Sequence, residues 1–273
     1  MTAPLERAFA FEREMHAAVG RTVTAAWGQA YLAPEIDRCY DRNMLWAIGD
    51  AGGIDAAALD AQAERLLGGH GMAHRRLQLE PRAEARLHDG LVGLGYDAGA
   101  HVFQIHAGPA PEPVAGVTVV EASMDAVEAA NDLHLRTDPD TPYGRDARTR
   151  RHLLEHHRSY GPTGGAERRF AVLDPADGAS VVAWARLWTR GAEAQVEDVV
   201  VLAPHRGRGY GRAVVAAATR TALAAGPELL FIVADAADWP KDLYARLGYV
   251  TAGATGVYLR FARMPQTSGP GAA

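Results

Sequence analysis

The chain has 273 residues, of which 48% are hydrophobic and 22% are charged, a composition typical of a globular protein with one large core or two modest ones. Its formal net charge of −5 gives no overall attraction for nucleic acid or for an anionic membrane, so neither is expected as a partner. Cys39 is the only cysteine, which excludes an intramolecular disulfide and a thiol-based metal cluster. Residues 1–16 lack the apolar core of a signal peptide and no stretch is long enough to span a bilayer, so a cytoplasmic protein is expected.

The first half of the chain alternates predicted strands and helices. Hydrophobic periodicity and turn residues give the order strand, helix, strand, helix, strand. These predicted elements cover residues 43–48, 55–67, 75–79, 82–94 and 100–105. Three prolines follow between Pro109 and Pro113, and such a run can neither continue a helix nor pair inside a sheet. An extended linker is therefore expected over residues 109–114.

The second half predicts a longer mixture of strands and helices. The predicted strands cover residues 117–121, 169–173, 180–188, 194–202, 229–234 and 257–261. The predicted helices cover residues 124–135, 146–157 and 211–224, and one more helix runs from Asp238 to a stop at Gly248. The tail over residues 265–273 is mostly Pro, Gly, Ser and Ala, and we expect it to be disordered.

The two halves repeat one order of elements. The tripeptide Leu-Gly-Tyr follows a helix in both, centred on Gly95 and on Gly248, an offset of 153 residues (248 − 95). The same order of strand, helix, strand, helix and strand occurs twice at this near-constant offset. This pattern favours a duplicated domain over a chance similarity of two α/β units.

A Gly-rich turn joins the apolar strand that ends at Leu202 to the helix that begins at Gly211. Glycines let the backbone approach an oxyanion closely, and the free N–H groups at a helix N-terminus point toward it. Three arginines add positive charge to the turn, namely Arg206, Arg208 and Arg212. The sequence therefore predicts an anion-binding cradle.

Two common nucleotide-binding motifs do not fit this turn. Gly209 and Gly211 form a Gly-x-Gly pair, which is weak evidence alone. The Rossmann motif needs a further glycine where Val214 stands, and the P-loop needs a Gly-Lys-Ser/Thr sequence that is absent. Both interpretations therefore fail on specific residues.

The turn instead resembles the pyrophosphate-binding motif of the GNAT superfamily, Arg/Gln-x-x-Gly-x-Gly/Ala at a strand–helix junction. Arg206, Gly209 and Gly211 occupy its three defining positions. Residues 243–249, Leu-Tyr-Ala-Arg-Leu-Gly-Tyr, are similar to the second signature of the family, Leu-Tyr-x-x-x-Gly-Phe. The resemblance covers residues 115–262. It implies an α/β fold (an α+β mixed sheet) of two GNAT-like domains flanked by helices, with the central strands splayed in the C-terminal one.

The resemblance also implies acetyl-CoA as co-substrate. In this family the acyl-pantetheine lies between the splayed strands, and backbone N–H groups bind the thioester carbonyl and serve as an oxyanion hole. The residues that the resemblance assigns to the cofactor are Val199, Val200, Val201, Arg206, Gly207, Arg208, Gly209, Tyr210, Gly211 and Arg212. The family often has an Asn shortly before the Tyr of its second signature, but residues 237–239 are Ala, Asp and Trp here. No Asn contact is therefore carried over.

Glu197 is the candidate general base. It lies on the strand that enters the cradle, where the family often places its catalytic Glu or Asp, and it acts there directly or through water. Strand alternation puts Gln195, Glu197, Val199 and Val201 on one face and Asp198 on the other. The competing interpretation is a structural carboxylate paired with an arginine.

Tyr244 is the candidate general acid. Its position in the second signature implies that its hydroxyl lies near the sulfur of CoA and returns a proton to the leaving thiolate. The competing interpretation is a packing residue between helix and sheet. No metal site is expected. His152, His156 and His157 have ligand-like spacing, but a solvated helix face is the favoured interpretation.

The N-terminal half lacks the catalytic features of the second half. Leu91 stands at the position equivalent to Tyr244, 153 residues earlier (244 − 153). The turn after Ile48 has glycines but no arginine, and Asp50 and Asp55 would repel a pyrophosphate. This half resembles the degenerate partner domains of tandem GNAT proteins.

These features predict four segments: a degenerate GNAT-like domain at 1–108, a linker at 109–114, a catalytic GNAT domain at 115–264 and a tail at 265–273. The expected activity is transfer of the acetyl group of acetyl-CoA to a primary amine of a small molecule. Two alternatives stay open at this point. One is transfer to a protein or peptide amine, and the other is a non-catalytic acyl-CoA sensor.

Overall fold

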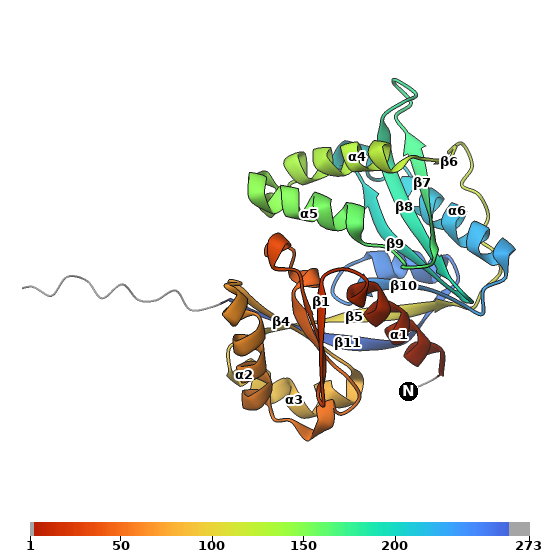
Figure 1. Cartoon of the computed structure of the whole chain (residues 1–273). Coiled ribbons are helices and arrows are strands. Elements are labelled where there is room, and N and C mark those ends of the chain that lie inside the picture. Colours follow the sequence, from red (N-terminus) through yellow and green to blue (C-terminus); the bar gives the residue numbers. More distant parts are fainter. Residues whose placement is uncertain (1–2, 262–273) are drawn as a thin grey trace, which may run out of the picture.

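The computed structural model describes residues 3–261, whose strands form one mixed sheet (Figure 1). The strands are β1 (Arg21–Ala25), β2 (Gly28–Leu32), β3 (Met44–Ala47), β4 (His74–Leu79), β5 (Asp97–His106), β6 (Val120–Glu121), β7 (Ala166–Leu173), β8 (Val181–Arg190), β9 (Glu193–Val201), β10 (Leu229–Asp235) and β11 (Tyr249–Phe261). Across the sheet they lie in the order β1-β2-β3-β4-β11-β5-β10-β9-β8-β7-β6. The pairs β3–β4 and β9–β10 are parallel, and the other neighbours are antiparallel.

Helices flank this sheet. They are α1 (Ala3–Ala17), α2 (Ala56–Leu66), α3 (Pro81–Gly93), α4 (Met124–Thr137), α5 (Ala147–Ser159), α6 (Tyr210–Ala225) and α7 (Pro240–Arg246). Asp55, Ser123 and Asp146 cap α2, α4 and α5, because each side chain accepts a hydrogen bond from the N–H three residues later. Figure 1 shows α4 and α5 on one side of strands β7–β9 and α6 on the other.

The two halves exchange their last strands. From β3 to β9 the sheet runs β3-β4-β11-β5-β10-β9, so each parallel pair is followed by the final strand of the other half. The order is the same when read from either end, with β11 and β5 at its centre. Two equivalent tyrosines support the same relation, since Tyr96 donates to Asp60 of α2 at 2.7 Å and Tyr249 bonds Thr219 of α6 at 2.8 Å. The arrangement agrees with the predicted repeat of elements.

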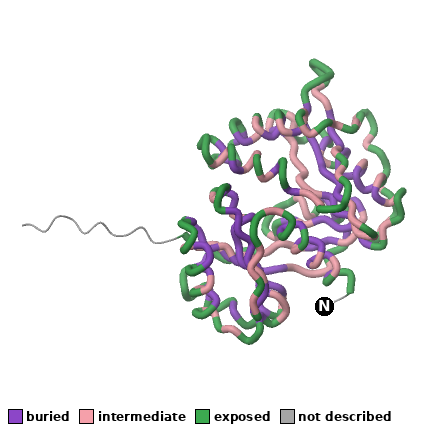
Figure 2. The backbone as a smooth tube through the Cα atoms, in the orientation of Figure 1, coloured by how far each residue is buried: buried purple, intermediate pink, exposed green. Residues whose placement is uncertain are grey.

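Three apolar clusters hold the fold together. One fills the second half around α6 and β8, and one fills the first half around α2 and β4. A third packs α1 onto strands of both halves, with edge-on ring contacts from Phe9 to Phe103 and from Phe11 to Phe231. In Figure 2 the buried residues follow the strands and the exposed ones follow the outer helix faces and loops. The shared third cluster joins the halves into one body.

Most predicted elements are present, with ends that differ by a few residues. The final strand is the largest error, because it begins at Tyr249 rather than at residue 257. Strands β1 and β2 were not predicted, and β6 keeps only two of the residues expected for it. Residues 107–119, which include the predicted linker at 109–114, contain no helix or strand. The predicted tail lies outside the described residues.

Candidate active site

Strands β9 and β10 separate midway along their length. Their parallel pairing ends at Val196 and Ile232, although both strands continue. A cavity of about 220 Å³ lies in this gap, and Glu197 and Tyr244 both line it. The corresponding strands of the first half, β3 and β4, stay paired to their ends. The predicted splay is therefore present in the second half and absent from the first.

The turn before α6 presents a row of free backbone donors. None of the N–H groups of residues 207–212 has a hydrogen-bond acceptor within the described chain. Gly207 and Gly209 have φ values of +77° and +81°, the left-handed region that glycine adopts without strain. A Cβ on Gly211 would lie 3.3 Å from the Val201 side chain, a tight contact, so a small residue is needed at this position. These features fit the pyrophosphate of acetyl-CoA.

The arginines of the turn differ in their roles. Arg206 is tied to the protein, since it donates to the Val201 carbonyl at 3.2 Å, to Asp138 at 2.5 Å and to Asp140 at 2.8 Å. It therefore holds the loop after α4 against the turn rather than standing free for a phosphate, which sequence reasoning did not anticipate. Arg208 and Arg212 are exposed and keep their charges available. The side chain of Tyr210 is buried, so it offers only its backbone.

A bulge in β9 changes which side chains share a face. Opposite β8 the register shifts between Trp184 and Arg186, and Asp198 has a φ of +55°. Asp198 accepts hydrogen bonds from Trp184 at 3.0 Å and from His157 at 2.6 Å. Arg186 lies opposite Glu197, and Trp184 and Arg186 share one face of β8. The expectation that Asp198 faces away from Glu197 was therefore wrong, because the bulge interrupts the alternation.

The bulge also changes which face of β9 the valines occupy, so the prediction that Val201 shares the face of Glu197 was wrong. Val200 lies opposite Trp184 and Val201 contacts Gly211 of α6, so Val201 is on the face opposite Glu197. Val199, Val200 and Val201 lie beyond the last pair with β10, so their backbone on that side is unpaired. These three residues thus border the gap with backbone groups, as a pantetheine contact requires.

The Glu197 carboxyl is held by an amide and faces other carboxylates. Gln195 donates from one nitrogen to Glu197 at 2.8 Å and also to Glu12 of α1. Burial raises the pKa of Glu197 well above its usual range, and the nearby charges of Glu12 and Asp198 raise it further. Burial likewise raises the pKa of Glu12 to about 7. A carboxyl with a raised pKa is a stronger base once ionised, which suits proton transfer from an amine.

Asp198 has the opposite electrostatic character. Burial raises the pKa of its carboxyl, but the hydrogen bond and charge of His157, the charge of Arg186 and the Trp184 hydrogen bond outweigh burial and lower the pKa to about 2. Asp198 is therefore ionised at neutral pH, and one of its carboxylate oxygens accepts both hydrogen bonds. It fixes α5 to β9 and raises the proton affinity of its neighbour Glu197.

Tyr244 is on α7 and lines the cavity in the gap between β9 and β10. Only 6% of the residue is exposed, and burial raises the pKa of its hydroxyl. Within the described residues that hydroxyl has no hydrogen-bond partner, and its ring meets Tyr249 edge-on at 6.4 Å. A protonated phenol that lines the cavity and lacks a protein partner can donate to a leaving group.

The histidines of α5 are not solvated, which corrects that prediction. His152 and His157 are 3% and 5% exposed, and His152 lies 3.2 Å from Asp37 of the first half. His156 lines a second cavity. None of these positions forms part of a group able to hold a metal ion among residues 3–261.

A second cavity, of about 190 Å³, lies on the α5 side of the sheet and adjoins the first cavity. The two share Glu197 and residues 233–235 of β10. The other residues that line it come from both halves: Glu12, His16, Asp41, Gln78, His101, His156 and Tyr160. Sequence reasoning missed this set, since its members are scattered over α1, the turn at Tyr40–Arg42, β4 and β5.

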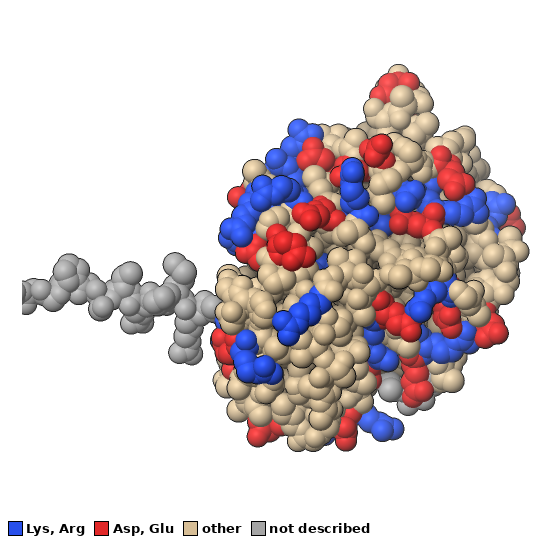
Figure 3. Space-filling model, viewed as in Figure 1, with Lys and Arg blue, Asp and Glu red and all other residues tan. Residues whose placement is uncertain are grey.

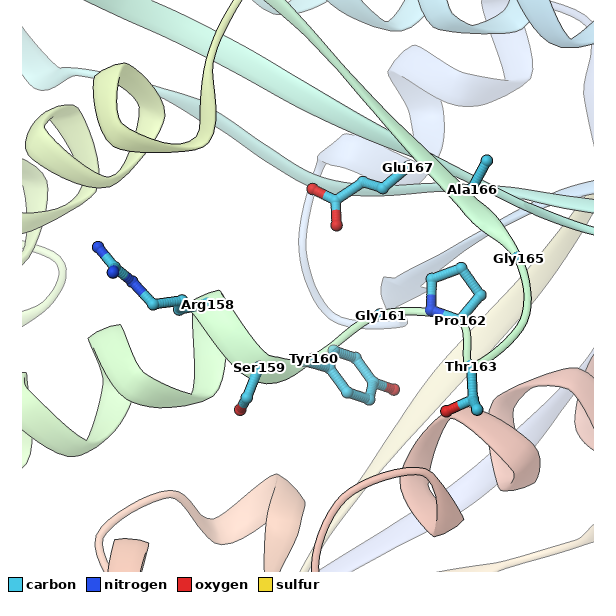
Figure 4. Close-up of a pocket in the computed structure, with 9 residues that line it drawn as sticks. All are labelled: Arg158, Ser159, Tyr160, Gly161, Pro162, Thr163, Gly165, Ala166 and Glu167. Atoms are coloured by element: carbon cyan, nitrogen blue, oxygen red, sulfur yellow. The ribbon is translucent and has the colours of Figure 1, made fainter.

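A third cavity, of about 260 Å³, lies where α5 leads into β7 (Figure 4). The figure shows its walls formed by the end of α5, the connecting loop and the start of β7. Its charged groups already have partners, since Glu167 binds Arg186 at 2.8 Å and Arg158 binds Glu128. This cavity therefore has no free charged group for a ligand.

The first half lacks a comparable cradle in its described residues. In the turn after β3, Asp50 accepts the N–H of Gly52 at 3.1 Å. Asp55 accepts the N–H of Ala58 at 2.7 Å and so occupies the N-terminus of α2. Leu91, at the position equivalent to Tyr244, is fully buried. The donors that a pyrophosphate would need are used by the carboxylates of the turn.

The charged surface has no large patch of one sign in the view of Figure 3, where Lys and Arg are interspersed with Asp and Glu. No helix within residues 3–261 is both long and apolar enough to cross a membrane.

Part of the chain is similar to a known protein family. Residues 130–249 match the model of the acetyltransferase (GNAT) family. No curated protein is similar enough to count as a relative. Among solved structures, a GCN5-related N-acetyltransferase from Kribbella flavida is 22% identical, with a TM-score of 0.59 over 93% of both chains.

Two further solved structures share the fold. A conserved protein of unknown function from Staphylococcus epidermidis is 17% identical, with a TM-score of 0.64 over 89% of this chain and 95% of its own. A tandem GNAT protein from the clavulanic acid biosynthesis pathway is 17% identical, with a TM-score of 0.51 over 75% of this chain and 69% of its own. The matched residues 130–249 contain the splayed strands, the cradle, Glu197 and Tyr244. Residues 130–249 therefore form a domain that is similar to the acetyltransferase (GNAT) family.

Proposed function

We propose that the protein transfers the acetyl group of acetyl-CoA to a primary amine of a small molecule. The observation that carries the proposal is that Glu197 and Tyr244 line one cavity in the gap between β9 and β10. The free N–H groups of residues 207–212 lie at the start of α6, directly after β9, where the pyrophosphate would bind.

Glu197, the backbone of β9 and Tyr244 each assist a different step of the reaction. Glu197, directly or through a water molecule, accepts a proton from the amine as the amine nitrogen bonds to the thioester carbon. Unpaired backbone N–H groups of β9 stabilise the negative charge on the carbonyl oxygen. When the carbon–sulfur bond breaks, Tyr244 donates its proton to the thiolate, and the products are an N-acetyl amine and CoA.

The shape of the second cavity supports a small acceptor. It adjoins Glu197 and is walled by residues of both halves, with a volume of about 190 Å³. That volume suits a small-molecule amine.

The test is CoA release measured with libraries of small amines and of peptides. We expect release with small amines, and Tyr244→Phe should lower kcat about 10²-fold with little change in acetyl-CoA affinity, because the proton donor acts only after attack. The lower end of the usual effect is expected because a thiolate is already a good leaving group.

Each contrary outcome has a clear meaning. Release only with peptides would favour a protein acceptor, and binding of acetyl-CoA without release would favour a sensor. Full activity in Tyr244→Phe would make this tyrosine a packing residue.

A further inference from the structure

We propose that the second cavity is the acceptor site, that both halves of the chain build it, and that its ligand is an aliphatic amine with a second cationic group at its far end. This inference rests on the proposed function and names its substrate class. Five neighbouring strands, β9, β10, β5, β11 and β4, cross the region, and the cavity extends from Glu197 on β9 to Gln78 on β4.

The chemistry of the cavity wall selects a cation. Four carboxylic acids line it, namely Glu12, Asp41, Glu197 and Asp235. Among the described residues that line it, none is Lys or Arg. Two arginines lie near the cavity but do not line it. Arg76 pairs with Asp41, and the buried Arg42 packs against the ring of Tyr160, so their positive charges offset part of the negative charge of the carboxylates. A ligand in the cavity therefore meets hydrogen-bond acceptors, and a carboxylate or phosphate would find no cationic partner.

Asp41 provides the anchor at the far end. Its side chain is 57% exposed, and its one described ion pair joins a single carboxylate oxygen to Arg76 at 2.5 Å. The ion pair with Arg76 lowers the pKa of the Asp41 carboxyl to about 2, so this carboxyl is ionised at neutral pH. Asp41 lines the cavity and its second oxygen has no ion pair among the described residues, so the carboxylate remains a charged acceptor for a ligand.

The histidines of the wall are neutral and leave hydrogen-bonding capacity free. Burial lowers the pKa of His16, of His101 and of His156, the last to about 3. His16 is 6% exposed, and its Nδ1 has no hydrogen-bond partner among residues 3–261. A buried, unpartnered nitrogen in a cavity wall is costly unless a ligand or water satisfies it.

The two ends of the cavity lie at different strands, which calls for an extended ligand. Four strand-to-strand steps separate β9, which carries Glu197, from β4, whose Arg76 pairs with Asp41. Val233 and Ala234 of β10 line the path next to Glu197 and suit methylene groups. A linear diamine or polyamine has the required form, with one nitrogen at Glu197 for acetylation and another toward Asp41.

The experiment compares three series of acceptors on the full-length protein: linear diamines and polyamines, monoamines of matched length, and ω-amino acids of matched length. We expect the best diamine or polyamine to have a KM about 10-fold or more below that of the matched monoamine, because a hydrogen bond to a charged group is added. The ω-amino acids should be the poorest acceptors. Calorimetry with the amine alone gives a binding readout that does not depend on turnover.

Asp41→Asn is the decisive variant. It should raise KM for the diamine about 10-fold and raise that for the matched monoamine far less, with the main effect on KM rather than on kcat. Glu64→Gln is the matched control, because Glu64 pairs with the neighbouring Arg75 at the same 2.5 Å outside this cavity. If Asp41→Asn fails to fold, the double variant Asp41→Asn/Arg76→Gln removes the whole ion pair and should show the same selective loss.

The outcomes separate this inference from the proposed function. Equal KM values for diamines and monoamines, or an equal effect of Asp41→Asn on both, would overturn the inference and leave acetyl transfer intact. Binding of a diamine that weakens in Asp41→Asn, without acetylation of any amine, would support the site and overturn the proposed activity.

Discussion

Gln195 joins two carboxylic acids that are 185 residues apart in the sequence (197 − 12), one from each half of the chain. Glu12 is an acceptor of the same amide that holds Glu197, and its negative charge is one reason that the pKa of Glu197 is raised. The first half therefore influences the proton affinity of the candidate base. Like charges in contact couple the two titrations, so the pair titrates as a unit.

This coupling predicts a change in pH dependence. A general base works in its ionised form, so kcat/KM should rise with pH through the raised pKa of Glu197. Glu12→Gln keeps a hydrogen-bond acceptor for Gln195 but removes the charge, and it should therefore move the acidic limb of the profile to lower pH. Glu197→Gln should remove that limb and lower the rate by about 10²–10⁴-fold.

The measurement is kcat/KM between pH 5 and 10, in about one-unit steps, for both variants and for Glu14→Gln as control. Glu14 is also on α1, but it pairs with Arg190 away from the cavities. A profile that Glu12→Gln leaves in place would mean that Glu12 has only a structural role. A limb that persists in Glu197→Gln would place the base elsewhere.

At the scale of elements, the tight packing at the start of α6 leads us to predict a substitution that should prevent acetyl-CoA binding. A side chain on Gly211 would meet Val201 at 3.3 Å and fill the close approach to the free N–H groups. Gly211→Val should therefore abolish detectable acetyl-CoA binding in calorimetry while the thermal unfolding transition persists. Gly93→Val is the control, because a Cβ at this helical glycine meets nothing within 4 Å. Unchanged affinity in a folded Gly211→Val protein would refute the cradle.

The sequence predicted most helices and strands of the chain because period and turn chemistry are local properties, although β11 and β6 differ from their expected bounds. The Gly-rich turn and Tyr244 could be found because short motifs carry them. The orientation of Asp198 could not, since the bulge depends on pairing with β8 and on the His157 hydrogen bond. The second cavity was equally out of reach, because Glu12, Asp41 and His101 meet only after the halves associate. Long-range pairing therefore limits what a single sequence can predict.

At the scale of the whole molecule, the halves share one architecture, but only the second has the strand gap and the free N–H groups that we propose bind acetyl-CoA. The pair β3–β4 has no gap, and Asp50 and Asp55 occupy donors in the turn that follows β3. A titration followed by calorimetry should therefore give one equivalent of acetyl-CoA per chain. Gly211→Val should reduce this to none. Two equivalents in the unmodified protein would show that the first half retains a site.

The exchange of β5 and β11 has a consequence for synthesis of the chain. The edge of β4 is covered only by β11, whose first residue, Tyr249, follows the end of β5 at His106 by 143 residues (249 − 106). At about 5–20 residues per second, the ribosome needs roughly 7–30 s to make that interval. During this time the nascent first half presents an unpaired strand edge, which is a template for association with other chains. Completion of the sheet thus waits for β11 to be translated, and the first half alone should associate through this edge when expressed without the second.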